Sequence, residues 1–143
     1  MVSSRAPALV DTDVFSLVVA RSNASDSRVP RWREQLVGRQ FVISFQTSAE
    51  VIGGALANEW GERRTRELRA IIDRTPTIGV DAEVVEAFAR LTADSRRAGH
   101  PLHGKAHTGD RWIAACAVAK DLPILTGDRI FSGVPRLSLL MGE

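Results

Sequence analysis

The chain has 143 residues, 44% hydrophobic and 25% charged, a composition typical of one globular domain large enough to bury a sizeable core. Its hydrophobic runs are far shorter than a bilayer span and no signal-peptide pattern precedes them, so we expect a cytoplasmic protein that does not contact membranes. The single cysteine, Cys116, excludes an intrachain disulfide framework and a cysteine-ligated zinc site. The formal net charge of +2 permits a nucleic-acid partner without requiring one.

Short apolar segments alternate with helical segments along the whole chain. In chain order, strands are expected at residues 7–10, 41–45, 77–80, 122–125 and 137–140. Helices are expected at residues 14–21, 30–38, 48–59, 62–73, 82–98 and 110–120, and loops at 22–30 and 99–109. Strands separated by helices predict a single α/β domain over residues 1–143, with three α/β/α layers and a central parallel sheet.

Four acids fall where strands end or helices begin. They are Asp11 after the first strand, Glu50 early in the helix after the second, Asp110 at the start of the last helix and Asp128 after strand 122–125. Ligands collect at this edge of open parallel sheets. Two carboxylates about 4 Å apart repel by roughly 4 kcal/mol at an effective dielectric near 20, so the cluster should raise its own pKa values or recruit a cation. Oxygen ligands suit Mg²⁺ or Mn²⁺, and the chemistry predicted is metal-assisted hydrolysis of phosphodiester bonds.

Three of these acids also have an ordinary structural interpretation. The sequence from Thr47 to Glu50 matches a capping box, in which Glu50 would only cap its helix. Asp110 could be a first-turn acid that interacts with the helix dipole, and Asp128 could belong to a simple turn. Asp11 has no such routine role, and the shared position of all four favours a joint site.

Four segments carry a resemblance to a known family: LVDTDVF, SAEV, GDRWIAACAVAKDLPILTGDRIF and PRLSLL. Together they resemble the PIN domain, in particular the VapC-type toxins of bacterial type II toxin–antitoxin systems. The resemblance implies a small endoribonuclease that depends on Mg²⁺ or Mn²⁺. Its acidic quartet matches Asp11, Glu50, Asp110 and Asp128. Asp11 and Asp110 would be the principal metal ligands, while Glu50 and Asp128 would bind through waters, hold a second ion or orient the attacking water.

The same resemblance suggests supporting residues and partners. Thr12 and Thr126 occupy positions where the family often has a hydroxyl that supports the acids. Asp13 stands where such toxins commonly carry Asn or Ser, so it is either a fifth carboxylate near the metal or a helix cap. The implied partners are an RNA substrate, a second copy of the chain and a small VapB-type antitoxin that blocks the site. Promoter DNA would be bound only through the antitoxin.

Several arginines are candidates for contact with RNA. Arg111 follows Asp110 and could pair with an acid or touch a phosphate. Arg63 and Arg64 lie in the basic segment 61–74, which is either a solvated face over a core stripe or a phosphate-contacting rim.

Three histidines, His100, His103 and His107, precede Asp110 at spacings that match no common zinc site. They predict a loop that faces solvent or RNA.

Two other functions have to be weighed. The pair Asp11 and Asp13 also resembles the first motif of haloacid-dehalogenase-like phosphatases, as nucleophile and general acid. That family normally has a further acid shortly after the late one, and none follows Asp128 before Gly133. A catalytically silent PIN-like binding module is the second alternative, which cleavage of RNA in a Mg²⁺ titration would exclude.

Overall fold

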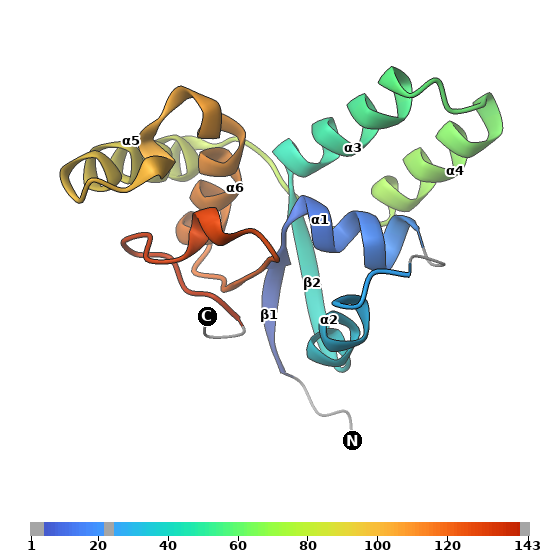
Figure 1. Ribbon diagram of the computed structural model, residues 1–143, viewed down its shortest axis with the longest axis horizontal. Helices are drawn as coiled ribbons and strands as arrows, with labels where there is room; N and C mark the ends of the chain where they lie inside the picture. Colours follow the sequence, from blue (N-terminus) through green and yellow to red (C-terminus); the bar gives the residue numbers. More distant parts are fainter. Residues whose placement is uncertain (1–4, 22–24, 141–143) are drawn as a thin grey trace.

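The computed structural model describes residues 5–21 and 25–140, and a parallel sheet forms its centre. The strands are β1 (Arg5–Val10), β2 (Arg39–Ser44), β3 (Thr77–Ile78) and β4 (Ile124–Leu125). All neighbours run parallel, in the order β3-β2-β1-β4 (Figure 1). This confirms the predicted parallel α/β sheet.

Helices cover both faces of this sheet. They are α1 (Thr12–Val14), which continues into the π-helical segment η1 (Phe15–Ala20), α2 (Val29–Leu36), α3 (Phe45–Ala57), α4 (Glu62–Asp73), α5 (Ala82–Arg97) and α6 (Thr108–Ala119). Helices α5 and α6 lie on one side of the strands and α1 to α4 on the other (Figure 1). Three short 3₁₀ turns complete the fold: η2 (Pro101–His103), η3 (Lys105–His107) and η4 (Arg129–Phe131).

The alternation of side chains along the central strands produces two hydrophobic cores. Leu9 and Ile124 pack with residues of α5 and α6, whereas Val10 and Leu125 pack with α1, α2 and α4 on the other face. Successive residues of a strand point to opposite faces, so an uninterrupted apolar strand fits a sheet that is buried on both sides. The three-layer architecture follows from this pattern.

The predicted strand at 137–140 is largely wrong. Only a single parallel bridge forms, between Ile124 and Leu139, with hydrogen bonds from the Ile124 N–H to the Ser138 carbonyl and from the Leu140 N–H to the Ile124 carbonyl, both 2.9 Å. Strands β3 and β4 are also shorter than predicted. Proline cannot donate to a sheet ladder, and Pro76 and Pro123 directly precede the segments where pairing begins.

The boundary of α3 changes the interpretation of Glu50. The helix begins at Phe45, three residues before the predicted start, because the Ser44 hydroxyl accepts a hydrogen bond from the Thr47 N–H at 3.1 Å and caps it. A capping box that starts at Thr47 is therefore wrong, and Glu50 lies in the second turn with no capping role.

The predicted loop at 99–109 contains η2 and η3, and α6 begins at Thr108. Of the predicted loop at 22–30, residues 22–24 lie outside the described part of the chain. Within residues 5–21 and 25–140, no helix combines the length and the apolar character needed to cross a membrane.

Candidate active site

Asp11 is a buried carboxylate at the end of β1. Its side chain is only 5% exposed, and both of its oxygens accept hydrogen bonds. Oδ1 accepts from the Thr12 N–H at 2.7 Å, and Oδ2 accepts from the Thr126 hydroxyl at 2.7 Å. Burial is the main cause that raises the pKa of Asp11 from 3.8 to about 7, and the charges of Asp13 and Asp110 raise it further against these hydrogen bonds. The fold thus holds an acid where ionisation is unfavourable without a counter-charge.

Glu50 is connected to this strand end through Thr12. The Thr12 hydroxyl donates to Glu50 Oε1 at 2.6 Å and also lies 2.9 Å from the Thr47 hydroxyl. The second oxygen, Oε2, accepts from Gln46 Nε2 at 2.9 Å, one turn earlier on α3. Both carboxylate oxygens of Glu50 are therefore held by uncharged donors.

Asp110 lies in the first turn of α6 and faces the same region. Its Oδ2 is 2.9 Å from His107 Nδ1. The preceding residue, Gly109, packs against Glu50: a Cβ at this glycine would lie 3.0 Å from Glu50 Oε2 and 2.8 Å from Gln46 Nε2. The start of α6 and the second turn of α3 are thus in direct contact, which places Glu50 beside Asp110.

Asp128 and Asp13 organise the loop after β4. Asp128 caps η4 by accepting from the Ile130 N–H at 3.0 Å, and its own N–H donates to the Thr126 hydroxyl at 2.9 Å. Asp13 Oδ2 accepts from the Gly127 N–H at 3.0 Å. Burial raises the pKa of Asp13, Arg28 opposes that rise and the charge of Asp128 adds to it. Because Asp11 is the N-cap of α1, Asp13 is not the cap; it ties the first helix to the loop that carries Asp128.

The donor set is suited to a hard divalent ion. All the converging groups offer oxygen, and the charges of Asp13 and Asp110 reach Asp11. In the described part of the chain, however, no three Asp, Glu, His or Cys side chains are close enough to hold one ion together. Mg²⁺ usually keeps several waters and binds few carboxylates. The residues therefore fit an ion bound partly through water.

Arg111, predicted as a possible phosphate contact, points elsewhere. It is 7% exposed, and its Nη1 donates to the carbonyls of Leu102 and Gly104 at 2.6 and 3.1 Å. Its guanidinium also lies 4.7 Å from the centre of the Phe88 ring. The structure therefore places Arg111 in the support of the η2–η3 segment, away from any accessible phosphate.

Arg63 and Arg64 lie on α4, outside α3 (Figure 1). The Arg63 side chain is 86% exposed and 3.9 Å from Glu67, while the Arg64 guanidinium stacks 3.9 Å from the Trp60 ring centre. No hydrogen bond or ion pair among the described residues links either arginine to the four acids.

Two contacts of the site were not predicted from the sequence, although the spacing of the residues that form them is informative. Gln46 is four residues before Glu50, and His107 is three residues before Asp110. Side chains at these separations share one face where the chain is helical. The helical spacing could not be used as a signal, because Gln46 lies between the predicted strand 41–45 and the predicted helix 48–59, and His107 lies in the predicted loop 99–109.

The fold and site together define an α/β/α protein with carboxylates gathered at the C-terminal edge of a parallel sheet. The PIN domain model matches residues 8–137 of this chain. Ribonuclease VapC4 from Mycobacterium tuberculosis (strain ATCC 25618 / H37Rv) is 30% identical over 135 residues, which span 93% of this chain and 95% of that relative. The chain therefore belongs to the PIN domain family.

Solved structures agree in fold. VapBC2 from Rickettsia felis, bound to a DNA fragment from its promoter, aligns with a TM-score of 0.72 at 21% identity and covers 93% of this chain and 96% of that chain. DNA-bound VapBC from Salmonella typhimurium aligns with a TM-score of 0.69 at 21% identity, covering 96% and 97%. The family match also removes the haloacid-dehalogenase-like alternative for Asp11 and Asp13.

Proposed function

We propose that this protein is a metal-dependent endoribonuclease and the toxin of a type II toxin–antitoxin system. The observation that carries the proposal is the buried Asp11 carboxylate, surrounded by other acids and held only by neutral donors. The name of the Mycobacterium relative, Ribonuclease VapC4, supports RNA as the substrate. One structural relative, from Klebsiella pneumoniae, is named as a toxin–antitoxin complex, and another, from Mycobacterium tuberculosis, as a member of the VapBC family of toxin-antitoxin systems, which supports the biological role.

In this proposal Asp11 and Asp110 would hold Mg²⁺ or Mn²⁺, and Asp128 would contribute through water. A bound ion of this kind supplies an activated water and stabilises the charge that develops on the phosphate oxygens. The Thr126 hydroxyl and the Thr12 N–H fix the two oxygens of Asp11, so its carboxylate does not have to reorient when substrate binds. Glu50, whose Oε1 accepts from the Thr12 hydroxyl, would orient the attacking water and accept its proton.

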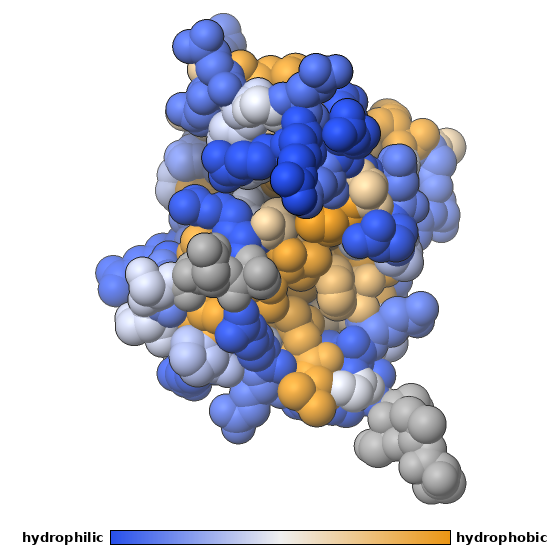
Figure 2. Space-filling view, turned by 90° about the vertical axis from the view of Figure 1, so that its right-hand side faces the viewer, coloured by the Kyte–Doolittle hydropathy of each residue, from blue (hydrophilic) through white to orange (hydrophobic). Residues whose placement is uncertain are grey.

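The partner proposed for inhibition is a VapB-type antitoxin. A groove of about 170 Å³ between η1 and α3 has Thr12, Glu50 and Trp60 among its lining residues. Leu56, next to the lining residue Ala55 on α3, is 57% exposed. The face drawn in Figure 2 shows a broad hydrophobic band. An amphipathic segment bound in this groove would reach Glu50 and cover the acids. Binding of promoter DNA would then belong to the complex, and a second copy of the toxin would complete it as a homodimer.

Cleavage of RNA by the purified protein tests the proposal. We expect hydrolysis that rises with added Mg²⁺ and disappears in Asp110→Asn. Asp73→Asn, which removes an exposed carboxylate at the end of α4, is the matched control and should cleave as the wild type does. A wild-type protein that cleaves no RNA at any Mg²⁺ concentration would instead favour a silent binding module.

A further inference from the structure

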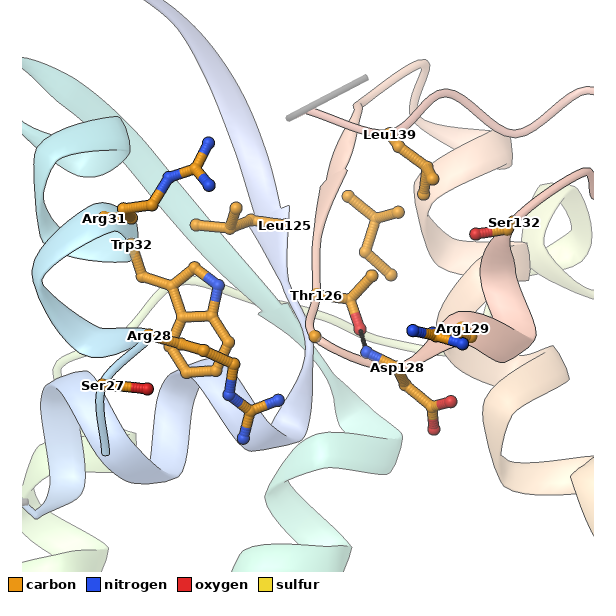
Figure 3. Close-up of a pocket in the computed structure, with 12 residues that line it drawn as sticks. Ser27, Arg28, Arg31, Trp32, Leu125, Thr126, Asp128, Arg129, Ser132 and Leu139 are labelled. Carbon is orange, nitrogen blue, oxygen red and sulfur yellow. Dashed lines mark hydrogen bonds between the residues drawn. The ribbon is translucent and has the colours of Figure 1, made fainter. Parts of the chain in front are cut away.

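A second cavity opens on the other side of the loop that carries Asp128. It has a volume of about 340 Å³ and lies between α2 and the C-terminal segment that follows β4 (Figure 3). Its lining includes Arg31 and Trp32 from α2, and Arg129 and Leu139 from the opposite side. We propose that this cavity binds one nucleotide of the RNA, next to the phosphate that is cleaved. The inference rests on the proposed function and adds the position of a substrate subsite.

The cavity is continuous with the acidic site through Thr126. This residue lines the cavity, and its hydroxyl donates to Asp11 Oδ2 at 2.7 Å. Asp128 lines the cavity as well and is joined to the same hydroxyl through its N–H. A ligand in the cavity would therefore contact Thr126, whose hydroxyl bonds to the buried carboxylate.

The charges around the opening select an anion. Three arginines line the cavity, and Asp128 is the acid among the lining residues. Arg28 is paired with Asp26 at 2.9 Å, whereas Arg31 and Arg129 have no ion-pair partner within residues 5–21 and 25–140. Figure 3 shows Arg31 and Arg129 on opposite sides of the opening. Guanidinium groups placed in this way suit the phosphate oxygens of a nucleic acid.

The walls are suited to a flat apolar body. Trp32, Ile124, Leu125 and Leu139 form the interior surface. The Arg28 guanidinium stacks 4.8 Å from the centre of the Trp32 ring and is held in place by its bonds to Asp26. Bases of single-stranded RNA also stack on arginine planes. Trp32 itself is 3% exposed, so the Arg28 guanidinium that covers its ring offers the plane for a base. An apolar interior with cationic groups at the rim is what a base with its attached phosphate requires.

The size of the cavity agrees with one nucleotide. Small-molecule sites occupy roughly 300–1,000 Å³, and this volume of about 340 Å³ is near the lower limit. The cationic groups also offset the repulsion that four carboxylates exert on an RNA backbone, and they do so at the site itself.

Binding of single nucleotides tests the cavity directly. The four nucleoside 5′-monophosphates are added in turn to the metal-free protein, and the indole N–H signal of Trp32, assigned with Trp32→Phe, is followed by NMR. Inorganic phosphate is the control for a purely ionic contact. We expect at least one nucleotide to shift the Trp32 signal at a concentration at least tenfold below that needed with phosphate.

Substitutions at the cavity should weaken this binding at least tenfold. Arg31→Ala and Arg129→Ala remove exposed cations and leave the core intact, and Leu139→Trp fills the interior. The matched control is Arg96→Ala on α5, which removes an exposed arginine elsewhere. If no nucleotide shifts Trp32, or if all three cavity variants bind as the control does, the proposal is overturned.

Cleavage kinetics separate this inference from the function on which it rests. We expect the cavity variants to raise KM for a cleaved RNA about tenfold with little change in kcat, the signature of a lost binding contact. Wild-type cleavage with unchanged KM in every variant would overturn the subsite and leave the nuclease intact. Nucleotide binding by a protein that cleaves no RNA would overturn the nuclease and leave a nucleotide site.

Discussion

Replacement of Asp11 by asparagine tests the electrostatics of the site most directly. The folded protein holds a proton on Asp11 up to about pH 7, whereas the unfolded chain releases it near pH 3.8. Between these values the folded state binds more protons than the unfolded state, so the free energy of unfolding falls as the pH rises and becomes level above pH 7. At 1.36 kcal/mol for each tenfold change, the interval from 3.8 to about 7 corresponds to a loss of about 4 kcal/mol.

Asp11→Asn should remove this loss. The amide oxygen can still accept from the Thr12 N–H, and the amide N–H can donate to the Thr126 hydroxyl, whose rotation allows it to accept. In the presence of a chelator, the free energy of unfolding of the variant minus that of the wild type should therefore increase by about 3 kcal/mol from pH 5 to pH 8. Urea unfolding at unit pH intervals measures the difference. Asp73→Asn, an exposed carboxylate, should show no such trend over this range.

Added Mg²⁺ should offset most of this advantage of the variant. A ligand that binds only the folded state at 100 times its dissociation constant stabilises it by about 2.7 kcal/mol. The wild type should gain this stability and Asp11→Asn should not, and the variant should cleave no RNA. A stability difference that stays constant from pH 5 to pH 8 would refute the reasoning, because it would mean that Asp11 ionises as freely in the folded protein as in the unfolded chain.

Other substitutions test the groups that hold the acids. Thr126→Val removes the donor whose hydrogen bond lowers the pKa of Asp11, so the acidic limb of the pH profile of kcat/KM should move to higher pH; an unchanged profile would contradict this. Gly109→Ala brings a methyl group to 3.0 Å from Glu50 Oε2. Since the flexible carboxylate can yield, the protein should keep its stability by urea unfolding while kcat falls about 10- to 100-fold. Arg111→Ala leaves buried carbonyls unbonded and should lower the free energy of unfolding by about 2–4 kcal/mol. If the variant instead shows a raised KM for RNA and unchanged stability, Arg111 does contact a phosphate of the substrate, as the sequence suggested.

That the C-terminal ends of β1 and β4 lie side by side could be predicted, because it depends on topology. Parallel strands place their C-terminal ends at one edge, so Asp11 and Asp128 were expected to meet although they are far apart in the chain. The bonds that orient them could not be predicted. The hydroxyl that holds Asp11 comes from Thr126, 115 residues later, and its choice of acceptor depends on side-chain packing in the folded state. The family resemblance suggested a supporting hydroxyl there but not which atom it bonds.

The prediction that Arg111 pairs with an acid or touches a phosphate is wrong, and the reason could have been found in the sequence. Consecutive residues of an α-helix point about 100° apart, so the neighbour of an acid at the start of a helix faces a different direction. Asp110 faces the sheet edge, and Arg111 turns to the carbonyls of the η2–η3 segment. Adjacency in sequence suggested a shared site where helical geometry separates the two side chains. The same helical geometry brings Gln46 to Glu50 and His107 to Asp110, two contacts that the sequence analysis did not predict.

The distribution of charge suggests why the acids remain available to a metal ion. In residues 5–21 and 25–140, no lysine or arginine forms an ion pair with Asp11, Glu50, Asp110 or Asp128. Hydroxyls, an amide and backbone N–H groups orient Asp11, Glu50 and Asp128 instead, and His107 Nδ1 lies 2.9 Å from Asp110 Oδ2. An arginine at this position would compete with a divalent ion, whereas neutral donors fix the oxygens and leave the negative potential intact. Arg31 and Arg129, which form no ion pair among the described residues, line the cavity on the other side of the Asp128 loop. In the proposed function, the acids would attract the metal ion on one side of this loop and the arginines would attract the RNA backbone on the other.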